Sequence, residues 1–210
     1  MPDRELALEL YRRMAPRYDR GGARRPFPEL RRRAVDLLEL KPGDSVLDVG
    51  CGTGLALPLL GDAVGPEGRI VGIDQSPDML GLARNRVELS GWRNVTLIES
   101  PVEDADIPGE VDAALFALSH DIIRSPNAVE NVVQHVEPGG RISVVGMTWN
   151  PWWALPFNIV FGIRLRRGAT TYEGLGRPWS HLGKFIPGLQ VKRVFRGLHG
   201  GYYFAWGVRP

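Results

Sequence analysis

Two different spacings of apolar residues divide the chain into an amino-terminal part and the rest. The first 15 residues repeat apolar positions at the spacing of a helix face, and Asp3 can cap this helix. The apolar face consists of Ala7, Leu10, Tyr11 and Met14. We expect the helix to end before Pro16, because proline cannot donate the next backbone hydrogen bond.

A second amino-terminal helix is predicted after a loop rich in glycine and proline at residues 17–28. Pro28 suits its first turn. Its apolar face consists of Leu30, Ala34, Leu37 and Leu38. On this helix Arg31, Arg32 and Arg33 are expected mostly to face water.

From residue 45 onwards, short continuous apolar runs alternate with helical stretches. The runs, which are typical of buried strands, cover residues 45–50, 69–74, 95–100, 111–118 and 141–147. Helices at 76–89 and 125–140 each begin with Ser-Pro, where Ser76 and Ser125 can cap. The pattern predicts an α/β fold with a doubly wound, mainly parallel sheet. Runs at 189–198 and 201–209 add an antiparallel hairpin at one edge, so we expect seven strands.

Length and composition favour one domain. The chain has 210 residues, 43% of them hydrophobic, which suits a single buried core. We divide it into a helical lid (1–41), a core (42–148), an apolar and basic insert (149–180) and a carboxyl-terminal helix and hairpin (181–210). Cys51 is the only cysteine, and charges interrupt the first apolar residues. A cytoplasmic protein without disulfides or a signal peptide is expected.

The net charge of +2 is unevenly distributed. Residues 1–41 carry 11 basic and 7 acidic side chains, residues 42–150 carry 6 and 16, and residues 151–210 carry 9 and 1. Two interpretations stay open. The basic ends either fold over the acidic middle or present a positive surface to an anionic partner.

A glycine loop follows the first predicted strand in "VLDVGCGTGLALPLL". The spacing Gly50-x-Gly52-x-Gly54 does not complete the dinucleotide pattern G-x-G-x-x-G, which weakens a pyrophosphate site. Asp74 ends the second strand, 20 residues after Gly54, where a carboxylate can accept hydrogen bonds from ribose hydroxyls. Loop and acid together indicate a nucleoside without a pyrophosphate. Taken singly, each glycine is also explained as a helix cap or turn.

The stretches "VLDVGCGTG" and "GIDQSPDML" resemble the first two motifs of the class I S-adenosylmethionine-dependent methyltransferases, and the resemblance covers residues 11–148. It implies a Rossmann-like fold, S-adenosylmethionine as cofactor, S-adenosylhomocysteine as product, and no metal. The residues that it implies around the methionine portion are Asp48, Gly50, Cys51, Gly52 and Gly54. Asp74 would hold the ribose, and Gln75 and Met79 would border the adenine.

Further cofactor contacts follow from the same resemblance. Pro101 stands where many relatives have an acid that binds the adenine amino group, so either Glu103 or backbone groups near Val102 replace it. Otherwise Glu103 belongs to a solvated acidic turn. Ala117, at the end of the fourth strand, is expected beside the cofactor. "MAPRYDR" resembles the lid of quinone and lipid methyltransferases, in which Tyr18 would approach the cofactor or pack the lid on the sheet.

Methyl transfer requires an aligned nucleophile and exclusion of water, and a base only if the acceptor loses a proton. His120 follows the fourth strand, next to the reacting sulfur that the resemblance implies. It is the candidate catalytic base or orienting group; the alternative is a local hydrogen-bonding role. Asp121 either orients His120 or faces solvent, and we expect the second. His181 is an outlying candidate.

An uncharged segment runs from Ile142 to Ile163. Its length approaches a membrane span, but a strand occupies its first part and Asn150, Pro151 and Pro156 interrupt the rest, so we reject a transmembrane helix. Three interpretations of its aromatic residues stay open. They line an apolar acceptor pocket, they form an interfacial patch near Arg164, Arg166 and Arg167, or they pack in the core. The candidate substrate-binding residues are Tyr11, Trp149, Trp152, Trp153 and Tyr172.

The leading hypothesis is a methyltransferase that acts on an oxygen, nitrogen or carbon of a largely apolar small molecule. The termini look most like bacterial ubiquinone/menaquinone and phosphatidylethanolamine methyltransferases, so secondary metabolites, quinones and phospholipids lead as acceptors, in that order. The alternative is a peripheral membrane protein that binds anionic lipid and has a regulatory nucleoside site. An oxidoreductase is disfavoured by the glycine spacing. "NPWW" lacks the second proline of a nucleic-acid methyltransferase motif, so no nucleic-acid partner is expected, and the sequence gives no oligomeric state.

Overall fold

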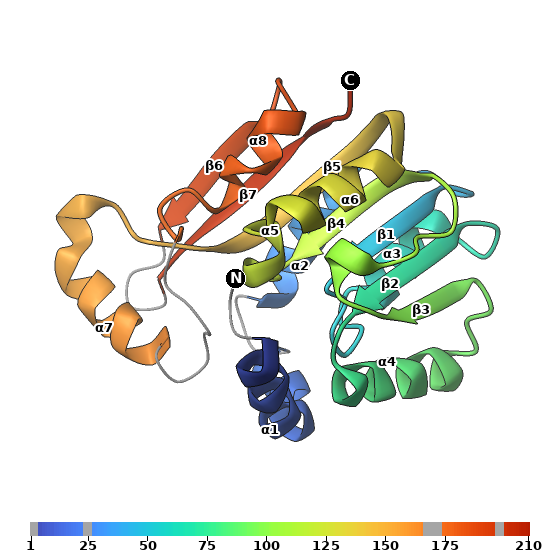
Figure 1. The fold of residues 1–210 in the computed structure, drawn as a ribbon, viewed down its shortest axis with the longest axis horizontal. Coiled ribbons are helices and arrows are strands. Elements are labelled where there is room, and N and C mark those ends of the chain that lie inside the picture. Colours follow the sequence, from blue (N-terminus) through green and yellow to red (C-terminus); the bar gives the residue numbers. More distant parts are fainter. Residues whose placement is uncertain (1–3, 23–26, 166–173, 196–199) are drawn as a thin grey trace.

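A single mixed sheet organises the chain (Figure 1). The computed structural model describes residues 4–22, 27–165, 174–195 and 200–210. The strands are β1 (Ser45–Val49), β2 (Arg69–Asp74), β3 (Val95–Glu99), β4 (Val111–Ala117), β5 (Val136–Thr148), β6 (Gln190–Phe195) and β7 (Gly201–Val208), in the order β3-β2-β1-β4-β5-β7-β6. Neighbours among β1 to β5 pair in parallel, and β7 pairs antiparallel with β5 and β6. The predicted seven-stranded, mainly parallel sheet is confirmed.

Helices connect the strands and cover both faces of the sheet. They are α1 (Arg4–Gly22), α2 (Phe27–Asp36), α3 (Leu57–Val64), α4 (Pro77–Ser90), α5 (His120–Ile123), α6 (Pro126–His135), α7 (Leu155–Leu165) and α8 (Leu182–Phe185), with 3-10 turns η1 (Val102–Asp104), η2 (Trp152–Ala154) and η3 (Pro178–Ser180). Both predicted Ser-Pro starts are confirmed, since Ser76 accepts from the amide of Met79 and Ser125 from that of Ala128.

Successive residues of a strand pack in two separate cores, because side chains alternate between the two faces of a sheet. In β4, Ala113 and Leu115 pack on the face covered by α2 and α3. Ala114 and Phe116 pack on the opposite face, with α6 and α8. The glycine loop between β1 and α3 is thereby fixed at the carboxyl edge of a sheet that is buried on both sides.

The predicted end of the first helix is wrong. α1 continues through Pro16 to Gly22, and α2 begins at Phe27, so residues 17–22 are helical instead of loop. An interior proline costs about 3 kcal/mol. Contacts with α4 lie on both sides of it and hold the helix in place: Arg12 pairs with Asp78 of α4 at 3.5 Å, and Asp19 pairs with Arg86 of α4 at 2.7 Å. Tertiary contact therefore outweighs local helix propensity here.

Two further expectations need correction. Arg31 was expected to face water but is only 7% exposed, whereas Arg32 and Arg33 do face solvent. Arg31 turns inward because anionic groups of β1 and α1 lie beneath α2, as described below. β5 also begins earlier than predicted, at Val136, where α6 has just ended. Among the helices that the structure describes, none combines the length and the apolar character needed to cross a membrane.

Candidate active site

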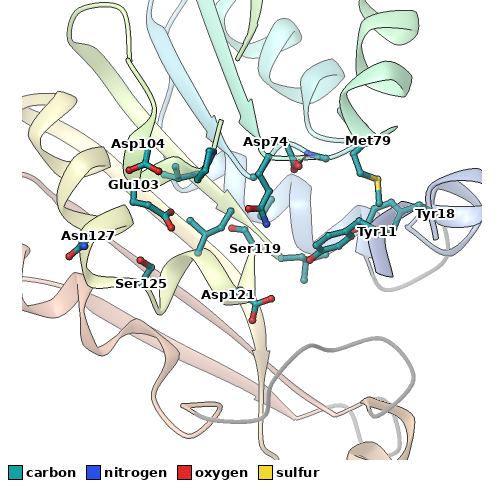
Figure 2. Close-up of a pocket in the computed structure, with 18 residues that line it drawn as sticks. Tyr11, Tyr18, Asp74, Met79, Glu103, Asp104, Ser119, Asp121, Ser125 and Asn127 are labelled. Carbon is teal, nitrogen blue, oxygen red and sulfur yellow. Dashed lines mark hydrogen bonds between the residues drawn. The ribbon is translucent and has the colours of Figure 1, made fainter. Parts of the chain in front are cut away.

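A cavity of about 400 Å³ opens at the carboxyl ends of β1, β2 and β4, the edge at which parallel sheets of this kind bind ligands. Figure 2 shows Tyr11 and Tyr18 approaching it from α1, opposite Glu103 and Asp104. Its lining consists of Tyr11, Tyr18, Gly50, Gly52, Asp74, Gln75, Met79, Pro101, Val102, Glu103, Asp104, Ala117, Leu118, Ser119, Asp121, Ile122, Ser125 and Asn127. The sheet edge, α1 and the η1 turn thus border one open cavity.

Asp74 is held rigidly at the end of β2. One carboxylate oxygen accepts from the amide of Gly52 at 2.9 Å, and the other accepts from the amide of Ser76 at 2.9 Å. Burial raises the pKa of Asp74, and these amide hydrogen bonds oppose the shift by favouring the charged form. A carboxylate fixed in this way keeps further lone pairs directed at the cavity, which suits the two hydroxyls of a ribose.

The glycines of the loop serve different packing needs. A Cβ at Gly52 would come no nearer than 4.0 Å to another group, the Asp74 carboxylate, so this glycine leaves the cavity open. A Cβ at Gly50 would lie 2.6 Å from the Cδ1 atom of Ile122. At Gly54 it would lie 2.7 Å from the Cδ1 atom of Leu57, outside the cavity. Gly54 therefore serves the packing of α3 and not the lining.

Replacement of Gly50 by alanine is expected to lower the free energy of unfolding by about 2 kcal/mol. The new methyl group would meet Ile122 and the Cβ of Ser119, the latter at 2.9 Å, and the backbone at φ +71° disfavours any side chain. Urea denaturation measures the loss. Gly91→Ala is the control, since Gly91 has φ +67° with open space around it. Equal losses in the two variants would contradict the steric explanation.

The charged side chains that line the cavity are all acidic. Asp74, Glu103, Asp104 and Asp121 line it, and none of the lining residues that the structure describes is lysine or arginine. Such a wall attracts a cation and repels a pyrophosphate. The charge of the cavity therefore opposes a dinucleotide, in agreement with the incomplete glycine pattern.

Asp48 lies below the glycine loop, on β1, and does not line the cavity. It is 1% exposed, and within the described part of the chain its Oδ2 atom has no hydrogen-bond partner. Burial raises the pKa of Asp48 to about 7, while the positive charge of Arg31 opposes that shift. The inward turn of Arg31 is explained by this buried carboxylate together with Tyr18 and Asp19, which also interact with the guanidinium.

A polar clasp fixes α1 against the loop. One oxygen of Asp19 accepts from the hydroxyl of Thr53 at 2.5 Å, and the other accepts from Arg86 at 2.7 Å. Arg86 also donates to the carbonyl oxygen of Thr53 at 3.0 Å. The glycine loop, α1 and α4 are thus joined at one point, and Tyr18 is held beside the cavity.

Replacement of Asp19 by alanine is expected to loosen α1, because it removes the two hydrogen bonds of the clasp that involve this helix. Hydrogen exchange should become faster along α1, and affinity for a ligand in the cavity should fall several-fold. Mass spectrometry after deuterium labelling measures the first effect. Glu9→Ala is the matched control, since Glu9 pairs with Arg13 on the same helix. Unchanged exchange in the Asp19 variant would contradict the clasp.

Tyr11 and Tyr18 contribute neutral hydroxyls to the cavity. Burial raises the pKa of both, and the negative charge of Asp121 adds to the effect on Tyr11. Each phenol therefore keeps its proton at neutral pH and can donate a hydrogen bond. Both residues belong to the amino-terminal segment, residues 1–41, that the sequence predicts to be a helical lid.

The junction of β4 and α5 brings Asp121 to the cavity in place of His120. Leu118 has the left-handed backbone φ of 64°, an unfavourable conformation for leucine, and its amide donates to the carbonyl oxygen of Val145 at 2.8 Å. After this turn Ser119 and Asp121 line the cavity, whereas His120 does not and its ring nitrogens are enclosed. The expectation that Asp121 faces solvent is therefore wrong.

Most of the residues predicted to bind the cofactor line this cavity, and the remaining ones do not. Cys51 is buried with its sulfur near Gly72, and with Asp48 and Gly54 it lies outside the lining. Trp149 stacks edge-to-face on Phe161 at 5.7 Å, away from the lining. Trp152 and Trp153 are 88% and 58% exposed, and Tyr172 lies outside the described residues. His181 immediately precedes α8, also away from the cavity, and its side chain makes no capping hydrogen bond.

Sequence reasoning missed Arg31, Asp19, Thr53 and Arg86. Thr53 stands within the glycine motif, so its place in the loop was a usable signal. The other three are charged residues on helices with many charges, and their spacing does not distinguish them from solvated neighbours. Only the contact between α1, α2, α4 and the loop reveals them.

The fold and the sequence of the core are similar to those of known methyltransferases. A SAM-dependent methyltransferase from Aquifex aeolicus has the same fold, with a TM-score of 0.58 at 22% identity over 86% of this chain and 89% of that one. Residues 46–140 match the family model described as a methyltransferase domain. Residues 46–140 are thus similar to a methyltransferase domain, and the chain has the fold of S-adenosylmethionine-dependent methyltransferases.

Two named relatives are similar to this chain over part of its length. An aklanonic acid methyltransferase from Streptomyces sp. strain C5 is 38% identical over 132 residues, which are 60% of this chain and 58% of that protein. A demethylmenaquinone methyltransferase from Listeria welshimeri is 26% identical over 172 residues, 75% of this chain and 70% of that protein. The similarity to the first relative therefore spans little more than half of its length.

The residues of the cavity fit the cofactor of this class. S-adenosylmethionine carries a sulfonium cation and a nucleoside, and it has no pyrophosphate. The acidic lining, the carboxylate of Asp74 and the open space at Gly52 match those features. A volume of about 400 Å³ lies within the range of small-molecule sites.

Proposed function

We propose that this protein transfers the methyl group of S-adenosylmethionine to an oxygen, nitrogen or carbon atom of a largely apolar small molecule. The observation that carries the proposal is the acidic cavity beside Asp74, which favours a cationic nucleoside over a dinucleotide. The cofactor supplies an electrophilic methyl group. The protein has to align the acceptor atom with the methyl group of the cofactor and to exclude water.

The positions of the lining residues suggest which part of the cofactor each of them contacts. Asp74 accepts from the ribose hydroxyls, and Gln75 and Met79 border the adenine together with Val102 and Glu103. The main chain at Gly50 and Gly52 faces the methionine portion. α1, held by the Asp19 clasp, closes the cavity with Tyr11 and Tyr18.

Proton removal, where the acceptor needs it, has two candidate residues. Asp121 lines the cavity and His120 adjoins it in the chain without lining it. We expect Asp121→Asn to lower kcat more than His120→Ala does, because Asp121 can reach an acceptor. Steady-state kinetics with the methylated substrate measure both values. A larger loss in the His120 variant would return the catalytic role to histidine.

The apolar acceptor is supported by the relatives. One is named for aklanonic acid and the other for demethylmenaquinone. We propose a secondary metabolite as the leading acceptor of this chain, followed by a quinone and then a phospholipid. Tyr11 presents part of the wall that such a molecule would meet.

Transfer of radioactive methyl groups tests the proposal. Labelled S-adenosylmethionine is incubated with the protein and, in turn, with a polycyclic aromatic carboxylic acid, a demethylated naphthoquinone and phosphatidylethanolamine vesicles. We expect label in an organic-soluble product of one class and release of S-adenosylhomocysteine. Protein that binds the cofactor and transfers label to none of these classes would contradict the proposed acceptors.

A further inference from the structure

The outer face of α7 is apolar where a surface helix is normally polar. Leu155, Ile159 and Ile163 recur at every fourth residue and are 62%, 58% and 56% exposed. The inner face is also apolar, since Phe161 is 4% exposed and packs on Trp149. The exposed row is therefore not explained by the packing of this helix on the sheet.

The row continues onto neighbouring elements. Trp152 of η2 is 88% exposed, and Trp153 stacks on Phe195 of β6 with 5.0 Å between ring centroids. Phe157 contacts the same ring from α7 at 5.9 Å. We call this surface the apolar ridge. It consists of Trp152, Trp153, Leu155, Phe157, Ile159, Ile163 and Phe195.

The charge of the surrounding sequence identifies the kind of partner. Residues 151–210 contain nine basic side chains and one acid, and Arg164, Arg166 and Arg167 follow the ridge directly in sequence. A second copy docked ridge to ridge would bring two strongly basic segments together, which is unfavourable. An anionic lipid surface offers both an apolar interior for the ridge and negative headgroups for the basic residues.

The position of the ridge agrees with this partner. α7 follows β5 and lies beyond the carboxyl ends of the parallel strands, at the same edge of the sheet as the cavity and α1 (Figure 1). We propose that the apolar ridge docks this protein on an anionic lipid bilayer. Docking there places the cavity edge toward the membrane, where apolar molecules collect. The membrane contact itself does not depend on the proposed methyl transfer.

Vesicle co-sedimentation of the full chain tests the proposal. The protein is expected to bind vesicles that contain phosphatidylglycerol, to bind vesicles of phosphatidylcholine alone at least tenfold more weakly, and to be released by high salt. The double variant Trp152→Ser/Ile159→Ser should lose at least tenfold in binding. Leu89→Ser is the matched control, because Leu89 is 90% exposed on α4, outside the ridge.

Three results would overturn membrane docking. The protein could ignore phosphatidylglycerol vesicles, or the ridge variant could bind them as tightly as the Leu89 control. Light scattering could instead reveal a dimer that the ridge variant dissociates, in which case the ridge is an interface between two copies. The ridge lies outside the cavity lining, so the ridge variant should bind the cofactor as tightly as the unaltered protein does. Cofactor titration of this variant therefore tests the cavity separately from membrane docking.

Discussion

Replacement of Asp74 by alanine is expected to weaken S-adenosylhomocysteine binding by about 100-fold. The substitution removes the acceptor for two ribose hydroxyls, and hydrogen bonds to a charged group contribute about 1.5–3 kcal/mol each. It also frees the amides of Gly52 and Ser76, which the carboxylate now holds at 2.9 Å. Calorimetric titration measures the change in Kd.

Asp62→Ala is the matched control for this prediction. Asp62 is an exposed carboxylate on α3, outside the cavity, so its loss should leave Kd unchanged. Circular dichroism establishes that the Asp74 variant is folded. A folded Asp74 variant with the affinity of the unaltered protein would contradict the proposed ribose contact.

Replacement of Arg31 by methionine is expected to destabilise the protein by about 3 kcal/mol at pH 8 and by about 1 kcal/mol less at pH 5. The difference arises from Asp48, whose pKa is raised from 3.8 to about 7 by burial, against the influence of Arg31. The contribution of Asp48 to the free energy of unfolding therefore falls as pH rises from about 4 to 7. Without Arg31 the pKa of Asp48 should rise further, so the penalty grows at alkaline pH.

Urea denaturation at the two pH values measures this effect. Arg32→Met is the control, since Arg32 is the exposed neighbour of Arg31 on α2 and should cost little at either pH. The double variant Arg31→Met/Asp48→Asn should lose the pH dependence. An equal loss at pH 5 and pH 8 in the single variant would mean that Arg31 contributes packing and not charge.

The sheet and the cofactor motifs were predictable because their signals are local. Each buried strand is a short apolar run, and the Ser-Pro pairs at Ser76 and Ser125 mark helix starts whose hydrogen bonds span three residues. Gly52 and Asp74 follow consecutive strands of the parallel sheet, whose carboxyl ends meet at one edge. Their proximity in the structure follows from that topology.

The failed expectations concern contacts between distant segments. Pro16 ends a helix by local rules, and only the ion pairs of Arg12 and Asp19 with α4 show why α1 continues. Arg31, Arg32 and Arg33 are chemically identical, and only the interactions of the first with Tyr18, Asp48 and Asp19 distinguish it. No pattern within a helix encodes a partner on another element.

The tryptophans illustrate the same limit within the candidate site. An uncharged aromatic segment suits a pocket, a core or an interface equally well. In the structure Trp149 belongs to a small core with Phe161, whereas Trp152 faces solvent. Composition identifies the segment as apolar, but the packing of α7 decides which face of it is covered.

Calorimetric titration of the unaltered protein with S-adenosylhomocysteine tests the central claim most directly. The acidic cavity beside Asp74 predicts binding of one molecule per chain in the micromolar range, and no heat from NADH, whose pyrophosphate the four carboxylates would repel. Tight binding of NADH, with none of S-adenosylhomocysteine, would contradict the assignment of the cavity.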